Sequence, residues 1–180
     1  MLHIFDFARE MNTLAVAFRL VLAVLCGGLI GIEREYKRRP AGFRTHILIC
    51  LGAAMTTLTS QYMFLTMHLY TDVARLGAQV IAGIGFIGAG TIIVTKRQRV
   101  KGLTTAAGLW TAAIIGLVCG AGYVECAIFA TAMVLVAELL LIKIEYRFAG
   151  KINDVNLYVE YAHAEVIENI LRAIRDKGIK

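Results

Sequence analysis

The chain has 180 residues, of which 58% are hydrophobic and only 18% charged, and its mean hydropathy is +0.68. An average soluble domain has about 25% charged and about 45–50% apolar residues, so this composition indicates an integral membrane protein. The net charge of +6 agrees better with positive loops on one side of a bilayer than with a nucleic-acid surface, and we predict no nucleic-acid partner. The cysteines have no paired CxxC spacing, which favours small buried thiols over a zinc site or disulfides. They are Cys26, Cys50, Cys119 and Cys126.

Five apolar segments follow one another along the chain. A helix needs about 20 residues to cross the hydrocarbon of a bilayer, and the segments approach that length. The sequence therefore predicts an all-α membrane protein with five transmembrane helices. The segments are Leu14–Ile32, Ile47–Leu69, Val73–Val94, Leu103–Cys119 and Tyr123–Ile142.

Lysine and arginine alternate between the connections. The segments EREYKRRPAGFRTH (33–46) and KRQRVKG (96–102) are basic, whereas the other two connections carry almost no cations. Basic loops stay on the cytoplasmic side of a membrane. This pattern predicts an outside N-terminus, two cytoplasmic basic loops and a cytoplasmic C-terminus.

The first span carries one charge and a pair of small residues. Arg19 lies near the outer end, where snorkelling to the interface is the favoured interpretation and pairing inside the bundle is the alternative. Gly27 and Gly31 have GxxxG spacing, which permits close helix contact within the chain or across a homodimer.

A charged pair, Glu33-Arg34, follows the first span at the inner membrane edge. If the helix continues, Glu33 reaches Arg34 poorly but can meet Lys37 four residues later. Across a helical interface it could instead face Arg44, our preferred mate, or the threonine pair that opens the fourth span. A solvated interfacial pair is the plain alternative. The candidate polar cluster at this edge is Glu33, Arg34, Arg44, Thr45, Thr104 and Thr105.

The third span is the richest in glycine. Its residues 83–88 match the dinucleotide pattern GxGxxG, but they lie inside an apolar run with no preceding strand and no acidic residue about 20 positions later, so we reject that function. We expect these glycines to allow close packing, against Gly27–Gly31 or across a dimer. Arg75 and Gln79 open the span one turn apart at the outer edge. The packing glycines are Gly83, Gly85, Gly88 and Gly90.

The last two spans carry few polar groups. Thr104 and Thr105 are placed to cap the fourth helix or to bond between helices, and Trp110 is deep enough to pack inside. Glu125 is expected at the interface, and Glu138 is expected to reach Lys143 or the headgroups.

The first four spans resemble two copies of one hairpin. Each hairpin places glycines before a basic loop and small residues in the returning helix, as in GGLIG (27–31) and GFIGAG (85–90). This suggests a parallel two-hairpin repeat with a fifth helix added, although the match is short enough to arise by chance.

The tail changes character after residue 147. DVNLYVEY (154–161) alternates like a strand, and AEVIENILRAIRDKG (164–178) has helical periodicity. One strand and one helix cannot bury both apolar faces alone. We therefore predict a transmembrane domain over residues 1–147 and an incomplete α/β domain over 148–180, with completion by a partner as the alternative.

Four blocks of sequence are similar to the MgtC/SapB family of bacterial inner-membrane proteins. They are GLIGIERE (28–35), AGFRT (41–45), ARLGAQVIAGIGFIGAG (74–90) and VKGLTTAAGLW (100–110). The resemblance implies five helices, in many members with a cytoplasmic ACT-like or ferredoxin-like domain. It also implies a non-enzymatic role in adaptation to low magnesium or acid stress and in virulence, through partner membrane proteins such as the F-type ATP synthase.

The residues themselves offer no nucleophile–base pair and no obvious metal-ligand set, so we predict no catalysis and no cofactor, with magnesium a possible ligand of the polar cluster. The leading prediction is a membrane regulator acting through helix contacts. The alternative is a transporter or channel for magnesium or protons, although few polar groups lie near mid-membrane.

Overall fold

The computed structural model describes residues 3–70, 72–94, 100–141, 166–168 and 172. The chain divides into two units, Met1–Ile144 and Glu145–Lys180. In the second unit the described residues are helical, and Arg172 Nη2 lies 3.4 Å from Glu168 Oε1 one turn away. The strand predicted over 154–161 lies outside the described residues.

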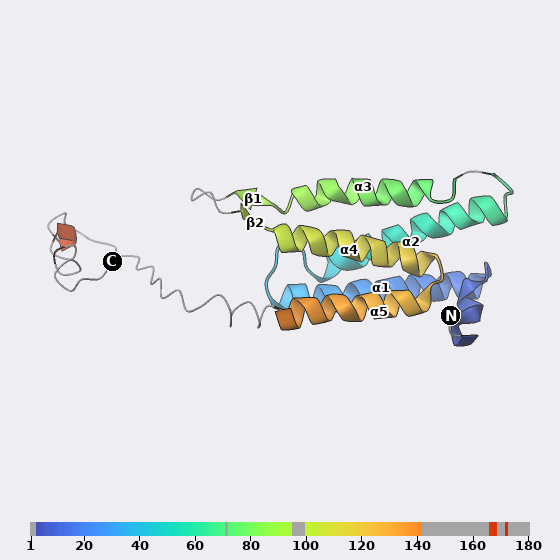
Figure 1. The fold of residues 1–180 in the computed structure, drawn as a ribbon, viewed down its shortest axis with the longest axis horizontal. Coiled ribbons are helices and arrows are strands. Elements are labelled where there is room, and N and C mark those ends of the chain that lie inside the picture. The colour runs from blue at the N-terminus through green and yellow to red at the C-terminus, as the bar shows by residue number, and fades with distance from the viewer. Residues whose placement is uncertain (1–2, 71, 95–99, 142–165, 169–171, 173–180) are drawn as a thin grey trace. The chain divides into compact units, whose positions relative to one another are not determined.

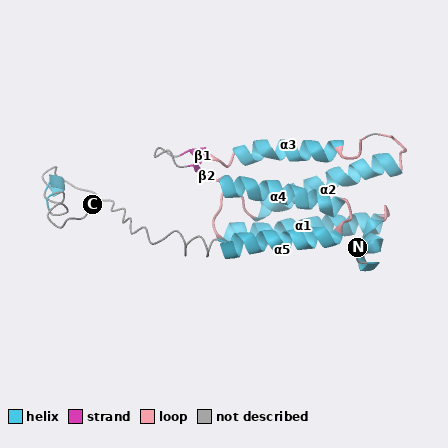
Figure 2. Ribbon diagram, in the orientation of Figure 1, coloured by secondary structure: helices cyan, strands magenta, loops and turns pink. Residues whose placement is uncertain are grey.

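The first unit is a bundle of helices that lie side by side along one axis (Figure 1). A short antiparallel hairpin with two residues in each strand precedes α4, pairing Ile93 with Lys101 and Val94 with Val100, and helices make up most of the rest (Figure 2). The elements are the 3₁₀ helix η1 (His3–Arg9), α1 (Thr13–Tyr36), α2 (Phe43–Leu65), α3 (Arg75–Ala89), β1 (Ile93–Val94), β2 (Val100–Lys101), α4 (Leu103–Gly120), α5 (Val124–Val136) and the π-helical turn η2 (Ala137–Leu141).

Within the described residues, three helices are long and apolar enough to cross a membrane: α1, α2 and α4. Helix α3 is apolar but only 15 residues long, and α5 has 13 residues before it continues into η2. The third predicted span was too long at its end, because the helix stops at Ala89 and β1 begins at Ile93. Five spans and the two-hairpin repeat stay predictions.

Glycines set the close contacts between helices. A Cβ on Gly27 would lie 2.7 Å from the main-chain oxygen of His46, and one on Gly31 would lie 2.7 Å from Phe43 Cα, so α1 packs against α2 at these two points. On α4, a Cβ at Gly116 or Gly120 would meet main-chain oxygens of α2. Helix α2 therefore packs closely against both α1 and α4, and close packing of this kind is what small residues permit in a membrane.

The glycines of α3 do not pack against α1, while the alternative, packing across a dimer, stays a prediction. Gly88 faces Ala106 of α4, 3.4 Å from the position of an added Cβ, and not the Gly27–Gly31 face of α1. Gly83 and Gly85 have no neighbouring atom within 4 Å of such a Cβ, and a Cβ on Gly90 would meet only the oxygens of its own helix end. Within the chain, then, only one of these four glycines supports a close helix contact.

The helix starts are set by Asn12 and Gly102. The Asn12 side chain accepts a hydrogen bond of 2.8 Å from the Ala15 N–H at the start of α1. Gly102 precedes α4 with a φ of +95°, a left-handed conformation that favours glycine. The expectation that Thr104 or Thr105 caps α4 is therefore wrong, since both lie inside the helix.

Arg19 is fully buried, and this overturns the snorkelling interpretation. Its guanidinium donates to the main-chain oxygens of Ala8 at 2.5 Å and Gly120 at 2.9 Å, and to the Gln61 side chain at 2.7 Å. The alternative, pairing inside the bundle, is the observed arrangement. Arg19 thereby joins the N-terminal segment, α2 and the end of α4.

Two other predicted side chains can be placed. Trp110 is 46% exposed and does not pack inside as predicted, because the buried face of α4 is occupied by smaller residues such as Gly108 and Ala112. Glu125 is mostly buried and accepts a 2.6 Å hydrogen bond from Arg9 of η1.

Candidate functional site

The last turn of α1 carries a buried pair of charges. The helix continues to Tyr36, so Glu33 and Lys37 lie one turn apart, and Lys37 Nζ lies 2.5 Å from Glu33 Oε1. Arg34 Nε lies 2.5 Å from Glu33 Oε2, although adjacent helical residues were expected to pair poorly. Both side chains are buried, with Arg34 only 1% exposed.

Glu138 joins this pair from the other end of the chain. Its Oε2 lies 3.2 Å from the same Arg34 Nε, and its main-chain oxygen accepts a 3.0 Å hydrogen bond from Lys37 Nζ. Glu138 lies in η2, the π-helical turn that ends α5, and such turns often occur at functional sites. We call Glu33, Arg34, Lys37 and Glu138 the charge cluster.

His46 of α2 is the next buried polar residue. It is 0% exposed, and its Nδ1 lies 2.9 Å from the main-chain oxygen of Gly42 one turn earlier. Its Nε2 has no hydrogen-bond partner among the described residues. His46 lies near the charge cluster because both approach Gly108 of α4. A Cβ added to Gly108 would lie 3.4 Å from Glu138 Oε1 and 3.9 Å from His46 Nε2.

The charge cluster is balanced. Two carboxylates face one guanidinium and one ammonium, so each buried charge has an opposite charge beside it, as burial requires. Removing one member would leave an uncompensated charge in a low-dielectric site. The described residues contain no group of three or more histidine, cysteine or acidic side chains that could hold a metal ion. The arrangement can fix the ends of α1 and α5 together.

Only part of the predicted polar cluster comes together. Glu33 and Arg34 are buried in it, whereas Arg44, the preferred mate of Glu33, is exposed and pairs with neither. Thr104 is exposed, Thr45 is half-buried, and Thr105 is buried in α4. None of these three threonines makes a described contact with Glu33. At the start of α3, Arg75 and Gln79 are both exposed.

Sequence reasoning missed Glu138 and His46 as members of the site. The expected partner of Glu138, Lys143, lies outside the described residues, and the observed partner is Arg34, 104 positions earlier in the chain. A signal was present, because an ionisable residue inside an apolar segment is by default a functional candidate. The partner of Glu138 could not be predicted from sequence spacing, because Arg34 lies in a different helix.

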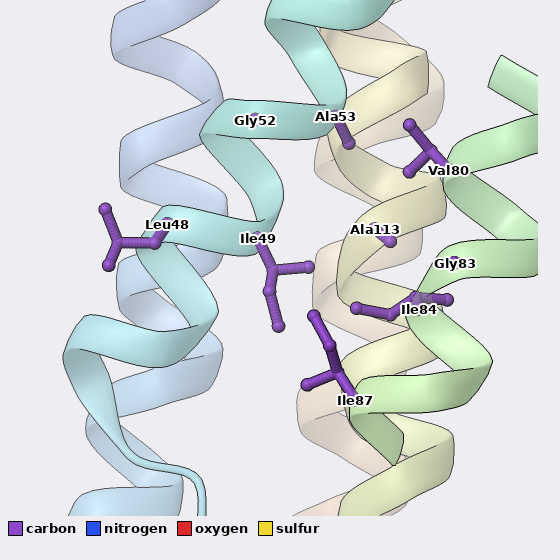
Figure 3. A pocket seen from close by; sticks show the side chains of 9 residues that line it. All are labelled: Leu48, Ile49, Gly52, Ala53, Val80, Gly83, Ile84, Ile87 and Ala113. Atoms are coloured by element: carbon purple, nitrogen blue, oxygen red, sulfur yellow. The ribbon is translucent and has the colours of Figure 1, made fainter. Parts of the chain in front are cut away.

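A second feature is an apolar groove between α2, α3 and α4, with a volume of about 490 Å³. Ile49 of α2 and Ile84 and Ile87 of α3 surround the space between the two helices (Figure 3). The lining is wholly aliphatic or glycine: Leu48, Ile49, Gly52, Ala53, Val80, Gly83, Ile84, Ile87 and Ala113.

Comparison with known proteins gives a consistent result. The model of the MgtC family matches residues 20–147. "Putative magnesium transporter YhiD" of Escherichia coli K12 is 41% identical over 137 residues, which cover 74% of this chain and 63% of that protein. "Protein MgtC" of Salmonella typhimurium is 44% identical over 123 residues, which cover 68% of this chain and 50% of that protein.

An uncharacterized protein of Haemophilus influenzae is 43% identical over 129 residues, which cover 69% of this chain and 54% of that protein. The chain thus spans between about half and two thirds of the length of these relatives. No solved structure matches it significantly.

Proposed function

Because the chain belongs to the MgtC family of membrane proteins, we propose that it is a non-enzymatic regulator that acts by binding the transmembrane helices of partner membrane proteins. The proposal includes five spans in the bacterial inner membrane with an outside N-terminus. It places the protein's action in adaptation to low magnesium or acid stress, and the F-type ATP synthase is the first partner to test.

The apolar groove beside α3 is the observation that carries this proposal. Two of the helices that line it, α2 and α4, are long enough to cross a membrane, so the groove lies at the depth of a membrane helix. Its lining has no charged or polar side chain, and Gly83 leaves the backbone of α3 open. A transmembrane helix of a partner, with aliphatic side chains and no charge, has the chemistry to fill it.

The balanced charge cluster supports a regulator over a transporter. A cation pathway requires carboxylates or carbonyls that face the ion, and in the cluster each carboxylate already faces Arg34 or Lys37. Within the described residues, the cluster gives a passing cation no unpaired negative charge.

A photo-crosslinking amino acid at position 83 tests the groove. Expressed in native membranes under magnesium limitation, this variant should give a discrete adduct with another membrane protein. The matched control carries the same amino acid at Leu25, which is exposed on α1 away from the groove, and should give only diffuse lipid products. Identical adduct patterns at the two positions would argue against the groove as the contact surface.

A second variant links the contact to function. Gly83→Phe fills the groove where no atom lies within 4 Å of an added Cβ, so it should preserve the folded protein. In this variant the photo-crosslinking amino acid is placed at Gly52 instead. Gly83→Phe should abolish the adduct formed from position 52, and it should also abolish growth under magnesium limitation. Retention of both would contradict the proposal.

A magnesium transporter is the second candidate, and the printed name of the E. coli relative favours it. The test is magnesium uptake into liposomes that contain only this protein. Uptake that is lost in a charge-cluster variant such as Glu138→Gln would establish transport. No uptake above empty liposomes is the result expected of a regulator.

A further inference from the structure

Two polar atoms, the buried Nε2 of His46 and Oε1 of Glu138, lie close to the small space that Gly108 leaves open. Measured from the position of a Cβ on Gly108, Glu138 Oε1 lies at 3.4 Å and His46 Nε2 at 3.9 Å. The two side chains come from η2 and α2, and Gly108 of α4 leaves the space between them open because it has no side chain. His46 is fully buried, and its Nε2 has no partner among the described residues.

The tautomer of His46 follows from its other nitrogen. Nδ1 lies 2.9 Å from the carbonyl oxygen of Gly42, and a carbonyl can only accept, so Nδ1 must donate. In the neutral imidazole Nε2 is then a hydrogen-bond acceptor. His46 Nε2 therefore lacks a donor, and the carboxylate oxygen Oε1 of Glu138, beside the same space, is a second acceptor.

An unsatisfied buried acceptor such as His46 Nε2 is costly, which makes a bound donor the simplest account. The donor has to be small, because an alanine methyl would fill the same space. It also has to satisfy both acceptors at once. A water molecule does so with its two hydrogens. A proton on Nε2 alone does not, because no hydrogen bond or ion pair joins His46 to Glu138 within the described residues.

The surrounding charges argue against a divalent cation. Glu138 of η2 borders the site, and its other carboxylate oxygen lies 3.2 Å from Arg34 Nε of α1. Arg34 in turn pairs with Glu33, and Glu33 pairs with Lys37. The two acids are already balanced by the two bases. An added double positive charge would lie beside a guanidinium that is only 1% exposed.

We propose that His46 Nε2, Glu138 Oε1 and Gly108 form a buried site that binds one exchangeable water molecule. The donor joins α2 to η2 across α4. The end of α5 is thereby held by two connections: the direct ion pair of Glu138 with Arg34 and the bridged contact with His46. Binding or release of the donor changes only the contact between His46 and Glu138 and leaves the ion pair with Arg34 in place. The site can therefore adjust the position of the end of α5. The inference does not depend on the proposed function.

Nitrogen-15 NMR of histidine-labelled protein in lipid nanodiscs tests the site directly. The His46 signal is assigned by its loss in His46→Gln, with the exposed His68→Gln as the matched control. We expect a hydrogen-bonded Nε2. A shift that stays constant from about pH 5 to about pH 8 supports a bound water molecule, whereas a shift to the protonated imidazole within that range would contradict it.

Gly108→Ala supplies the decisive control. Its Cβ would make only ordinary contacts, at 3.4 Å and 3.9 Å, so the protein should fold while the methyl excludes the donor. The Nε2 signal should then move to that of an unbonded nitrogen. The proposal fails if wild-type Nε2 is unbonded, if Gly108→Ala leaves the signal unchanged, or if magnesium chloride shifts Nε2 at constant pH and ionic strength.

Discussion

The contact between α1 and α2 at Gly27 yields the sharpest prediction. An added Cβ would lie 2.7 Å from the main-chain oxygen of His46 and 2.9 Å from Cys50 Cβ. Real Cβ atoms are not found that close, and the obstacle includes backbone, which cannot rotate away. Gly27→Ala therefore forces α1 and α2 apart. Gly83→Ala is the matched control, since it makes the same change inside an apolar helix with no atom within 4 Å.

The magnitude follows from the difference between the two variants. Alanine is favoured over glycine in a helix interior by about 1 kcal/mol, and this gain is common to both changes. Only Gly27→Ala adds the overpacking cost, which is about 1–3 kcal/mol when backbone has to move. We therefore expect Gly27→Ala to unfold more easily than Gly83→Ala by about 1–3 kcal/mol, with Gly83→Ala as stable as the wild type or slightly more stable.

The native cysteines provide the assay. Cys26, Cys50 and Cys119 are buried, so a thiol-reactive dye that fluoresces on reaction reports their exposure as the purified protein is heated in detergent. The midpoint for Gly27→Ala should fall below those of the wild type and Gly83→Ala. Equal midpoints for the two alanine variants would show that α1 and α2 do not approach as closely as the structure indicates.

Three further predictions concern the charged groups and the topology. Arg19→Met leaves the oxygens of Ala8, Gln61 and Gly120 without their donor, so it should destabilise the protein by about 3–5 kcal/mol in the same thiol assay. A midpoint within error of the wild type would show that Arg19 lies at the membrane interface instead of inside the bundle. Arg34→Met should lower the stability of the protein by a similar amount, because the carboxylates of Glu33 and Glu138 then lose the cation between them. Adding Glu138→Gln to Arg34→Met should recover part of that stability. No recovery would mean that Arg34 and Glu138 do not interact. A single cysteine at Tyr70, in a background without native cysteines, should react with an impermeant maleimide in intact cells, while one at Lys101 should not; the reverse pattern would invert the predicted orientation.

The fold could be predicted from the sequence where the residues of a single segment determine its structure. Apolar length located the helices α1, α2 and α4, and the Gly27–Gly31 spacing marked positions that the structure uses for close packing. The end of α3 was placed too late, because Ile93 and Val94 are as apolar as a membrane helix although they pair in a hairpin. Hydrophobicity alone cannot distinguish these two cases.

The site was predicted only in part for a related reason. Glu33 and Arg34 are adjacent in the sequence and could be identified together, but Glu138 reaches Arg34 only after the chain has formed four more helices. Choosing Arg44 as the mate of Glu33 assumed that a nearby basic loop supplies the partner. In the structure Arg44 lies on the exposed side of the first turn of α2, while His46, two residues later, is buried. The side of the helix on which each residue of this turn lies therefore decides whether it joins the site.

The distribution of these polar contacts distinguishes α3 from the rest of the bundle. Helix α1 carries two buried arginines 15 positions apart, roughly 22 Å along a helix, and both form hydrogen bonds or ion pairs with other parts of the chain. In the described part of the chain, no side-chain hydrogen bond or ion pair joins α3 to another helix, and Phe86 on its outer face is 86% exposed. Helix α3 is therefore held by apolar packing against α4 and α2 alone. Displacing it breaks no buried ion pair, whereas displacing α1 breaks several contacts to charged groups. A partner helix can compete for the groove at α3 without dismantling the bundle, which is the property that a regulator acting through helix contacts requires.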